Sequence, residues 1–231
     1  MANLLILGAS RGLGAAMVEG LPCKGDQVFG LSRSEPAWNR RKSAIKRDWI
    51  EADLCELGAV QNARRVIGRA PIDALIHVAG IWDEATFEEM HDDEIAEILD
   101  VDLRAFLAFT RGLASNLRRA GHAKIIAIGS TNGLDNGDMT AVAYSAAKFG
   151  LRGACQALRQ HFRKDGIAVT CLSPGSIASD VAYGDGAALK KHRGKRMPVE
   201  DIVAMIRCIL DLSPAACVKE ITMPALKDED V

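Results

Sequence analysis

The strongest constraint on the fold lies at the start of the chain, where an apolar run leads directly into a glycine-rich turn. Residues 4–7 read Leu-Leu-Ile-Leu, and Gly8, Gly12 and Gly14 follow before a helical pattern that reaches Leu21. A strand, a turn and a helix in this order let backbone N–H groups and a helix N-terminus face a pyrophosphate. The glycines suit a tight βα turn equally well, so the motif alone leaves both interpretations open.

Patterns of strand and helix type alternate along the rest of the chain. Runs of strand type lie at residues 3–7, 27–31, 74–78, 124–128 and 168–172, with weaker candidates at 49–53 and 220–223. The longest helical patterns cover residues 91–120 and 141–164, whereas the polar residues 34–47 are typical of a loop with a solvated turn. This alternation predicts an α/β fold in which residues 1–231 form a single doubly wound Rossmann domain. We expect a mostly parallel sheet of about seven strands with helices on both faces.

Composition and charge exclude several classes of function. With 231 residues, 48% of them hydrophobic, the chain is long enough for one sizeable core. Its net charge of −1 gives no field that would attract nucleic acid, and no apolar run approaches the roughly 18 residues of a membrane span. The first strand starts directly after Met1-Ala-Asn3, which leaves no room for a secretory signal. We therefore expect a soluble, cytoplasmic protein without nucleic-acid or membrane partners.

Cysteine and histidine show no pattern of metal ligands. The six cysteines lack Cys-x-x-Cys spacing, and several lie in apolar strand or helix patterns. The five histidines are scattered, without i,i+4 pairs and without nearby cysteines. The sequence therefore predicts buried free thiols and no metal site.

A tyrosine and a lysine four residues apart form the clearest catalytic candidate. In the stretch Tyr144-Ser-Ala-Ala-Lys148, a helix would place the phenol and the ammonium on one face. A free tyrosine has a pKa of about 10 and is a poor proton carrier at neutral pH, but a neighbouring ammonium favours the phenolate. The pair could then transfer a proton under physiological conditions. By itself the spacing is weak evidence, because it also occurs by chance on surface helices.

Taken with further motifs in the right order, this pair resembles the pattern of the short-chain dehydrogenase/reductase family, over essentially the whole chain. The other matches are the glycine loop, His77-Val-Ala-Gly80, Ser130 after an apolar strand, and Ser173-Pro-Gly175. The resemblance implies a catalytic set of Ser130, Tyr144, Lys148 and Asp102. In this set Ser130 would bind the substrate oxygen, Tyr144 would transfer the proton, and Lys148 would hold ribose hydroxyls and support Tyr144.

Three positions depart from the family pattern. Leu7 precedes the first glycine where a threonine is common, and Val78 stands where an amide is usual, so His77 is a candidate to replace its hydrogen bonds. Asp102 occupies the place of an asparagine that orients a water in the family's proton relay. An ionised carboxylate only accepts hydrogen bonds. Asp102 could hold that water, pair with Lys148, or serve as a structural acid, and the sequence leaves these three roles open.

The end of the second strand bears on the choice of cofactor. An enzyme that uses NAD places an acidic side chain there on the ribose 2′-hydroxyl, but this chain has Ser32 and Arg33. Arg33, with Arg11 from the glycine loop, could bind a 2′-phosphate, which predicts NADP(H); both could also be solvated surface residues. The resemblance further implies that Asp53 and Leu54 contact the adenine. The expected cofactor-binding residues are Gly8, Ser10, Arg11, Gly12, Leu13, Gly14, Ser32, Arg33, Asp53, Leu54, Ala79, Gly80, Tyr144, Lys148, Pro174, Gly175, Ile177 and Ser179.

The resemblance implies an NADPH-dependent oxidoreductase that moves a hydride between nicotinamide and a carbonyl or secondary alcohol. The alternative is a non-catalytic NADP(H)-binding sensor or regulator with the same fold. The changes at Asp102 and Val78 favour the sensor, whereas a sensor has no need for Ser130, Tyr144 and Lys148 together. We therefore expect an enzyme.

Substrate and partner selection are expected from loops and from one helix face. Residues 81–87, residues 131–139 and the segment after Pro174 would choose a small-molecule carbonyl or alcohol substrate. The basic residues 190–196 could attract an anion, or could be a solvated helix end. Small residues on the helix of Tyr144 indicate a homodimer, and a homotetramer stays open.

Overall fold

A parallel sheet forms the centre of the molecule, and its seven strands in the described part of the chain follow the order β3-β2-β1-β4-β5-β6-β7. The computed structural model describes residues 1–40, 44–82, 85–134 and 141–228. The strands are β1 (Asn3–Leu7), β2 (Gln27–Ser32), β3 (Lys46–Glu51), β4 (Ala74–His77), β5 (Lys124–Ile128), β6 (Ala168–Pro174) and β7 (Glu220–Met223). Every neighbouring pair runs parallel, which confirms the predicted α/β fold.

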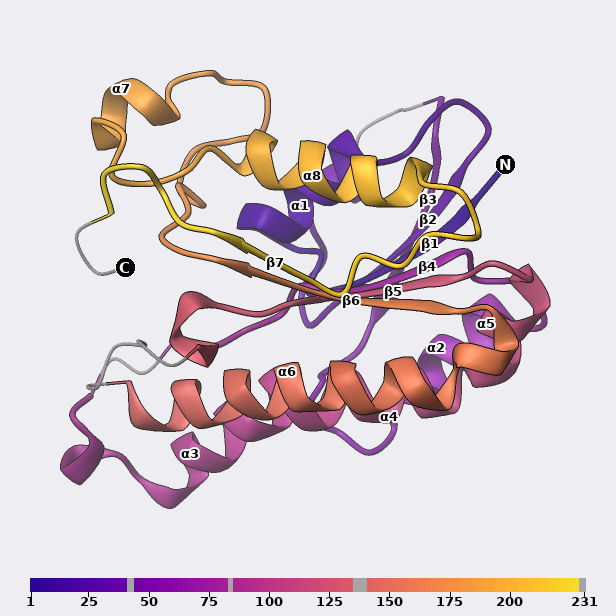
Figure 1. Cartoon of the computed structure of the whole chain (residues 1–231), viewed down its shortest axis with the longest axis horizontal. Coiled ribbons are helices and arrows are strands. Elements are labelled where there is room, and N and C mark those ends of the chain that lie inside the picture. The colour runs from indigo at the N-terminus through magenta and orange to yellow at the C-terminus, as the bar shows by residue number, and fades with distance from the viewer. Residues whose placement is uncertain (41–43, 83–84, 135–140, 229–231) are drawn as a thin grey trace.

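Figure 1 shows the sheet edge-on between two layers of helices. The helices α1 (Gly12–Gly20) and α8 (Val199–Asp211) cover one face, and α2 (Ala59–Ile67), α4 (Ala105–Gly112) and α6 (Val142–His161) cover the other. Further helices are α3 (Asp92–Leu99), α5 (Ala114–Ala120) and α7 (Ala188–His192), and shorter turns are η1 (Ala37–Arg40), η2 (Phe87–Glu89), η4 (Thr131–Gly133) and η5 (Arg163–Asp165). Among the helices described, none is both long enough and apolar enough to cross a membrane.

The two helix layers explain why the strands are continuous apolar runs. In β1, Leu5 and Leu7 join the core beneath α2, α4 and α6, whereas Leu4 and Ile6 join the core beneath α1 and α8. Successive side chains of a strand point to opposite faces, so a strand covered on both sides has no position for a solvated residue. The apolar run at residues 4–7 therefore predicted a central strand correctly.

The helical pattern predicted for residues 91–120 is three helices in the structure, not one. A π-helical turn, η3 (Asp100–Arg104), joins α3 to α4, and within it the N–H of Ala105 donates to the carbonyl of Asp100. A π turn accommodates one more residue than an α turn, and such turns occur often at functional sites. Here the turn carries Asp102, whose side chain is fully buried.

The solvated turn predicted within residues 34–47 is wrong for Trp38. The Trp38 side chain is 2% exposed, and its indole N–H donates to the carbonyl of Ala9 at 2.7 Å. Gly30 in β2 makes this possible, because a Cβ there would lie 2.5 Å from the Trp38 ring. Through this hydrogen bond to Ala9, Trp38 supports the glycine-rich turn. Residues 41–43 of this stretch lie outside the described residues.

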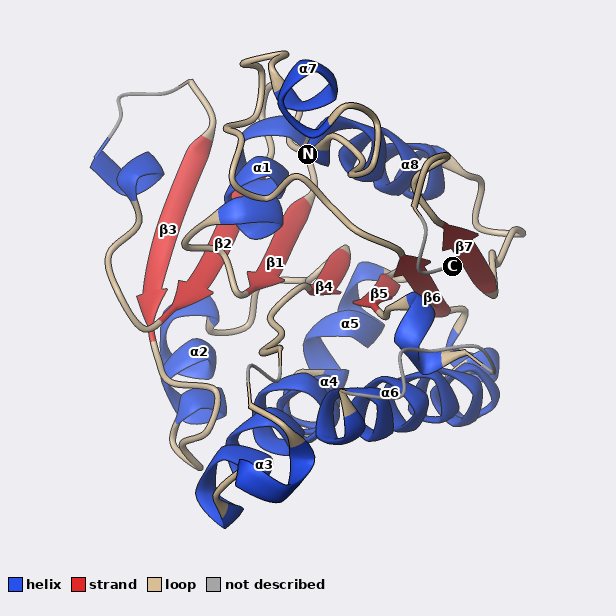
Figure 2. Cartoon of the chain, turned by 90° about the vertical axis from the view of Figure 1, so that its left-hand side faces the viewer, coloured by secondary structure: helices blue, strands red, loops and turns tan. Residues whose placement is uncertain are grey.

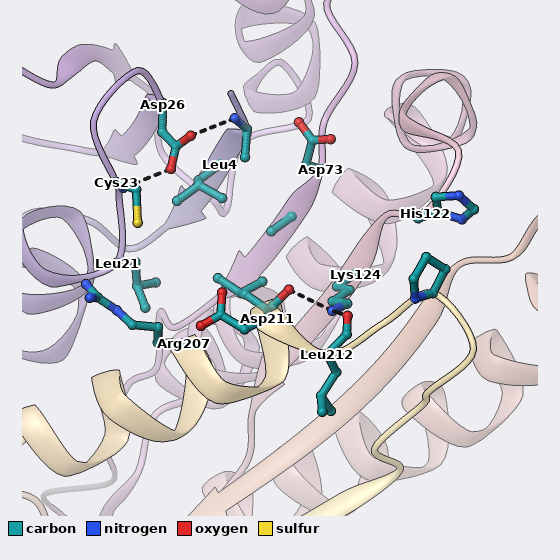
Figure 3. A pocket seen from close by; sticks show the side chains of 14 residues that line it. Leu4, Leu21, Cys23, Asp26, Asp73, His122, Lys124, Arg207, Asp211 and Leu212 are labelled. Carbon is teal, nitrogen blue, oxygen red and sulfur yellow. Dashed lines mark hydrogen bonds between the residues drawn. The ribbon is translucent and has the colours of Figure 1, made fainter.

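A hollow of about 280 Å³ lies at the amino ends of β1, β4 and β5 (Figure 3). It contains the buried Lys124, whose Nζ donates to the carbonyls of Ile209, Leu210 and Leu212 at 2.7, 2.8 and 2.6 Å. An ammonium has three protons, and these carbonyls use all of them. Lys124 therefore caps the end of α8, and the hollow is part of the scaffold.

Replacing Lys124 by alanine should lower the free energy of unfolding by about 2 kcal/mol, because three carbonyls at the end of α8 lose a charged donor. Urea denaturation followed by circular dichroism measures this change. Lys164→Ala removes an exposed lysine of η5 and serves as the control, with a midpoint close to that of the wild type. Equal midpoints for the two variants would contradict the proposed cap.

Candidate functional site

The predicted site residues gather at the carboxyl edge of the sheet, toward which Figure 2 looks. The glycine loop follows β1, and Ser32 and Arg33 lie at the end of β2. Asp53 and Leu54 follow β3, Ala79 and Gly80 follow β4, and Ser130 follows β5. The residues that end or follow β6 are Pro174, Gly175, Ile177 and Ser179. Tyr144 and Lys148 come from the start of α6, and Asp102 comes from η3. Parallel strands bring these distant segments to one edge, which is where open α/β sheets bind ligands.

The turn after β1 has the shape that a dinucleotide requires. Gly8 has a φ of +93°, and a Cβ there would lie 2.7 Å from the backbone of Ala79, so only glycine lets the turn approach the end of β4. Gly12 starts α1 and faces Ser179, to whose Cβ a side chain on Gly12 would come within 3.2 Å. Helix N-terminus and bare backbone together form a cradle that fits a pyrophosphate.

The side chains of two predicted cofactor residues are buried within the protein. Ser32 is 6% exposed; its hydroxyl donates to the carbonyl of Ser34 at 2.9 Å and accepts from the Trp49 indole at 3.0 Å. Leu13 packs in the core beneath α8. The Ser32 hydroxyl is thus already engaged by the indole on the neighbouring strand β3. Only backbone groups of these two residues are left to face a ligand.

A buried ion pair forms the centre of the site. Lys148 Nζ lies 2.8 Å from Asp102 Oδ1, and the two side chains are 3% and 0% exposed. Lys148 also donates to the Ile128 carbonyl at 3.1 Å, and Asp102 Oδ2 accepts from the N–H of Ile81 at 2.8 Å. The pair therefore joins α6, η3, the end of β5 and the turn after β4. Of the three roles that the sequence left open for Asp102, the geometry favours the pair.

Gly80 leaves the space that this ion pair needs. A Cβ on Gly80 would lie 2.9 Å from Asp102 Oδ1 and 3.3 Å from Lys148 Nζ. Burial opposes the charged form of Lys148, but the Asp102 carboxylate and the interaction with Tyr144 outweigh it, so the pKa of Lys148 is raised. The ammonium thus keeps its positive charge in a site largely closed to water.

Tyr144 lies near both this cation and an aromatic ring. Lys148 Nζ is 5.2 Å from the centre of the Tyr144 ring, and the centre of the Trp82 ring is 4.9 Å from it at an interplanar angle of 59°. Trp82 is 49% exposed, so it presents a free aromatic surface beside the tyrosine. The structure therefore brings Tyr144 and Lys148 together as predicted. Residues 83–84 and 135–140 of the predicted substrate segments lie outside the described residues.

Ser130 is held by a neighbour that the sequence analysis missed. Its Oγ accepts from the N–H of Asn132 at 3.2 Å and lies 3.5 Å from Asn132 Oδ1. Asn132 is 8% exposed, and its Nδ2 has no hydrogen-bond partner within the described part of the chain. At Gly133 a Cβ would lie 2.9 Å from the backbone of Lys148, so this glycine lets η4 pack against α6. The signal in the sequence was an amide two residues after the serine.

Arg33, predicted to bind a 2′-phosphate, is paired with two carboxylates. Its Nη1 donates to Glu97 Oε1 at 3.2 Å and lies 4.0 Å from Asp53 Oδ2. The Arg33 side chain is 64% exposed, and Arg11 is exposed as well. Asp53 also accepts from the N–H of Cys55 at 2.9 Å. The sequence analysis missed Glu97 because 64 residues separate it from Arg33.

The basic residues 190–196 are partly neutralised. Lys191 Nζ and His192 Nε2 each lie 2.8 Å from a carboxylate oxygen of Asp180. The hydrogen bond from Lys191 is the main reason that the pKa of Asp180 is lowered to about 2. These contacts favour a solvated helix end over an anion site.

The cysteines are free thiols, but only some are buried. Cys155 and Cys171 are buried, whereas Cys23, Cys208 and Cys217 are exposed, so the predicted burial is wrong for these three. They lie in loops or on the outer side of α8, where an apolar pattern does not imply coverage. Within the described ranges, no group of three or more histidine, cysteine or acidic residues is arranged to hold a metal.

His77 is the last residue of β4, and its side chain is completely buried. Burial, followed by the charge of Lys148, lowers the pKa of His77 to about 3. Backbone groups of Asp102 and Val101 in η3 interact with the His77 ring and offset part of this shift. The N–H groups of Val78 and Ala79 both donate to the Leu7 carbonyl at 3.0 Å. Backbone groups thus support the central turn.

Comparison with known proteins agrees with this geometry. The family model described as short chain dehydrogenase matches residues 2–188. Among curated proteins, the chain is similar to the acetoacetyl-CoA reductase of Rhizobium meliloti, with 31% identity over 182 residues that cover 77% of this chain and 74% of that protein.

Two solved structures illustrate the likeness in fold. The 4-hydroxyisoleucine dehydrogenase complexed with NADH has a TM-score of 0.84 at 22% identity, and the match covers 97% of this chain and 98% of that one. The L-sorbose reductase of Gluconobacter frateurii, complexed with NADPH and L-sorbose, has a TM-score of 0.84 at 18% identity, with 99% and 97% covered. At these identities the two matches bear on the fold alone.

The buried His77 should make the folded protein sensitive to acid. Its pKa is about 3 in the folded chain, against about 6.5 when unfolded, so only the unfolded state takes up this proton as the pH falls from 6.5 toward 3. Stability is therefore full above the unfolded pKa and is lost below it, by about 2 kcal/mol between pH 7 and pH 5.

Urea denaturation of His77→Asn and His77→Gln at the two pH values measures this loss. Each variant should lose about 2 kcal/mol less than the wild type on acidification, since neither side chain titrates. The control His122→Asn removes an exposed histidine and keeps the wild-type loss. An undiminished loss in both His77 variants would refute the assignment.

Proposed function

The chain belongs to the short-chain dehydrogenase family of oxidoreductases, and from this premise we propose that it reduces a carbonyl group with NADPH or catalyses the reverse oxidation of an alcohol. The observation that carries the proposal is the buried pair of Lys148 and Asp102 beside Tyr144, at the edge where the glycine loop ends. A sensor needs the glycine loop to bind a dinucleotide, but it has no use for a buried charge next to a phenol. This argues for an enzyme.

The proposed chemistry assigns one role to each side chain. A dihydronicotinamide bound at this edge would supply a hydride for the carbonyl carbon. Ser130 donates a hydrogen bond to the carbonyl oxygen, and Tyr144 gives that oxygen a proton as negative charge develops on it. In the reverse direction Tyr144 accepts the hydroxyl proton. Lys148, with Nζ 5.2 Å from the centre of the ring, stabilises the phenolate in both directions.

Asp102 acts in this proposal as a positioning residue. Its carboxylate fixes the Lys148 ammonium at 2.8 Å and offsets part of the positive potential that reaches Tyr144. Removing one partner of a buried pair leaves the other charge unpaired, so the two residues depend on each other. The pair thereby holds the ammonium in place beside the Tyr144 ring.

The cofactor is proposed to be NADPH, held along the carboxyl edge. Gly8, Gly12 and the N-terminus of α1 would face the pyrophosphate, and Lys148 would reach the nicotinamide ribose. Arg33 would meet the 2′-phosphate, with Arg11 nearby at the start of α1. Structures of similar fold have been solved with NADH and with NADPH, which supports a nicotinamide cofactor.

The substrate is proposed to be a small carbonyl compound or the corresponding alcohol. The similar acetoacetyl-CoA reductase is named for a carbonyl substrate. Trp82, half exposed beside Tyr144, would provide an apolar wall for such a molecule.

We also propose a homodimer through α4 and α6. Leu107 on α4 and Val142 and Phe149 on α6 are 40%, 39% and 43% exposed, although they are large apolar side chains. Apolar side chains that gather on one helical layer favour association. Gly150, a small residue on the helix of Tyr144, faces Leu103 of its own chain, where a Cβ would lie 2.8 Å from the leucine side chain.

Tyr144→Phe should abolish carbonyl reduction, by about a hundredfold or more in kcat, while leaving NADPH affinity within a few-fold of the wild type. Steady-state NADPH oxidation with a panel of ketones, aldehydes and diketones measures the first quantity, and fluorescence titration the second.

Tyr183→Phe is the matched control, since Tyr144 and Tyr183 are the two tyrosines of the chain. It keeps wild-type turnover because Tyr183 packs beside α1 and α8. Tight NADPH binding without turnover of any carbonyl by the wild type would favour the sensor. Undiminished turnover in Tyr144→Phe would remove the tyrosine from the reaction.

Asp102→Asn should lower kcat about tenfold or more across the pH range, because the buried Lys148 loses the carboxylate that keeps its ammonium charged beside Tyr144. The measurement is kcat against pH, with thermal unfolding to verify that the variant is folded. Asp100→Asn is the control, since this neighbour in η3 pairs with Arg104 and not with Lys148. A folded variant whose kcat equals that of the wild type at every pH would contradict the role of Asp102.

A further inference from the structure

One ion pair at the carboxyl edge is not used by the proposed chemistry. The guanidinium of Arg33, after β2, donates to Glu97 of α3 at 3.2 Å. Side chains that approach from β2 and from α3 meet there, next to Asp53 after β3. The contact thus lies at the part of the edge that the proposed function gives to the adenosine half of the cofactor.

The positive charge of Arg33 does not balance the negative charges of the two carboxylates beside it. One guanidinium serves two carboxylates, so Arg33, Asp53 and Glu97 together carry a net charge of −1. A 2′-phosphate would add further negative charge and would need the same guanidinium. The 2′-hydroxyl of NADH makes no such demand. A carboxylate on Arg33 therefore weakens NADPH binding and leaves NADH binding almost unaffected.

Glu97 is the stronger competitor of the two acids. Its Oε1 is within hydrogen-bond distance of Arg33 Nη1, whereas Asp53 Oδ2 lies at 4.0 Å. Asp53 is also engaged by the N–H of Cys55 at 2.9 Å, which holds it in the turn after β3. The Glu97 side chain is 43% exposed and carries no other hydrogen bond among the contacts described, so it can move away when a phosphate arrives.

We propose that Glu97 determines how strongly this protein prefers NADPH over NADH, by competing with the 2′-phosphate for Arg33. The inference rests on the proposed function, since it requires that a dinucleotide binds at this edge. Because Arg33 and Glu97 are both substantially exposed, water and salt weaken their contact, and Glu97 reduces the preference without abolishing it.

Isothermal titration calorimetry with NADPH and with NADH tests this proposal without any turnover. Glu97→Gln keeps the shape of the side chain and removes its charge. We expect it to lower the Kd for NADPH about threefold to tenfold and to change the Kd for NADH less than about twofold. Asp93→Asn is the matched control, because it removes one negative charge from the same helix at an exposed position. It should leave both affinities near those of the wild type.

Arg33→Gln, alone and combined with Glu97→Gln, shows whether the glutamate acts through the arginine. In the Arg33→Gln background most of the gain for NADPH should disappear, as a double-mutant cycle requires for residues that act through each other. The proposal is overturned if Glu97→Gln changes both affinities equally, if Asp93→Asn gives the same gain, or if the gain survives without Arg33.

The same titrations separate this proposal from the proposed function. Dinucleotide binding with the expected shift, but with no carbonyl turnover, would support the role of Glu97 and contradict the reductase. A wild-type protein that binds neither dinucleotide would overturn both.

Discussion

The carboxyl edge of this molecule depends on the ion pair between Lys148 and Asp102. Two charges that leave water cost several kcal/mol each by general estimates, and only close contact with further hydrogen bonds compensates that cost. Here the further hydrogen bonds come from two other elements, since Ile128 and Ile81 bind the pair from β5 and from the turn after β4. The pair therefore fixes where the helix of Tyr144 stands relative to the sheet. Gly80 and Gly133 contribute by leaving out side chains that would collide with it.

Much of the fold and part of the site could be predicted from the sequence because the signals are local. A strand covered on both faces must be apolar throughout, so each central strand was visible as a run, and parallel strands then placed the motif residues at one edge. The remainder depends on contacts between distant residues. Trp38 is buried only because Gly30 has no side chain, and Glu97 meets Arg33 only once α3 is folded. The burial of Asn132 likewise follows from the packing of η4 on α6.

Two buried lysines at opposite edges of the sheet show how the partner decides the behaviour of a charge. Lys124 faces carbonyl groups, and burial lowers its pKa. Lys148 faces a carboxylate that more than offsets its burial, and its pKa is raised. The first lysine holds a helix end in place. The second maintains a positive potential at the edge where we propose that protons are exchanged.

The π turn between α3 and α4 holds one more residue than an α turn, so the side chains of α4 are rotated about the helix axis relative to a continuous α-helix. Ile98 before the turn packs against α6, and Phe106 and Phe109 after it pack beneath the sheet, so both flanking helices are anchored independently of the turn. The number of residues between the anchors, and not only their chemical identity, therefore decides the direction in which Asp102 points. An insertion or deletion of one residue there would keep both helices and yet rotate the acid off Lys148. When related chains are compared, the number of residues in this turn is therefore as informative about the position of the acid as the identity of the residue.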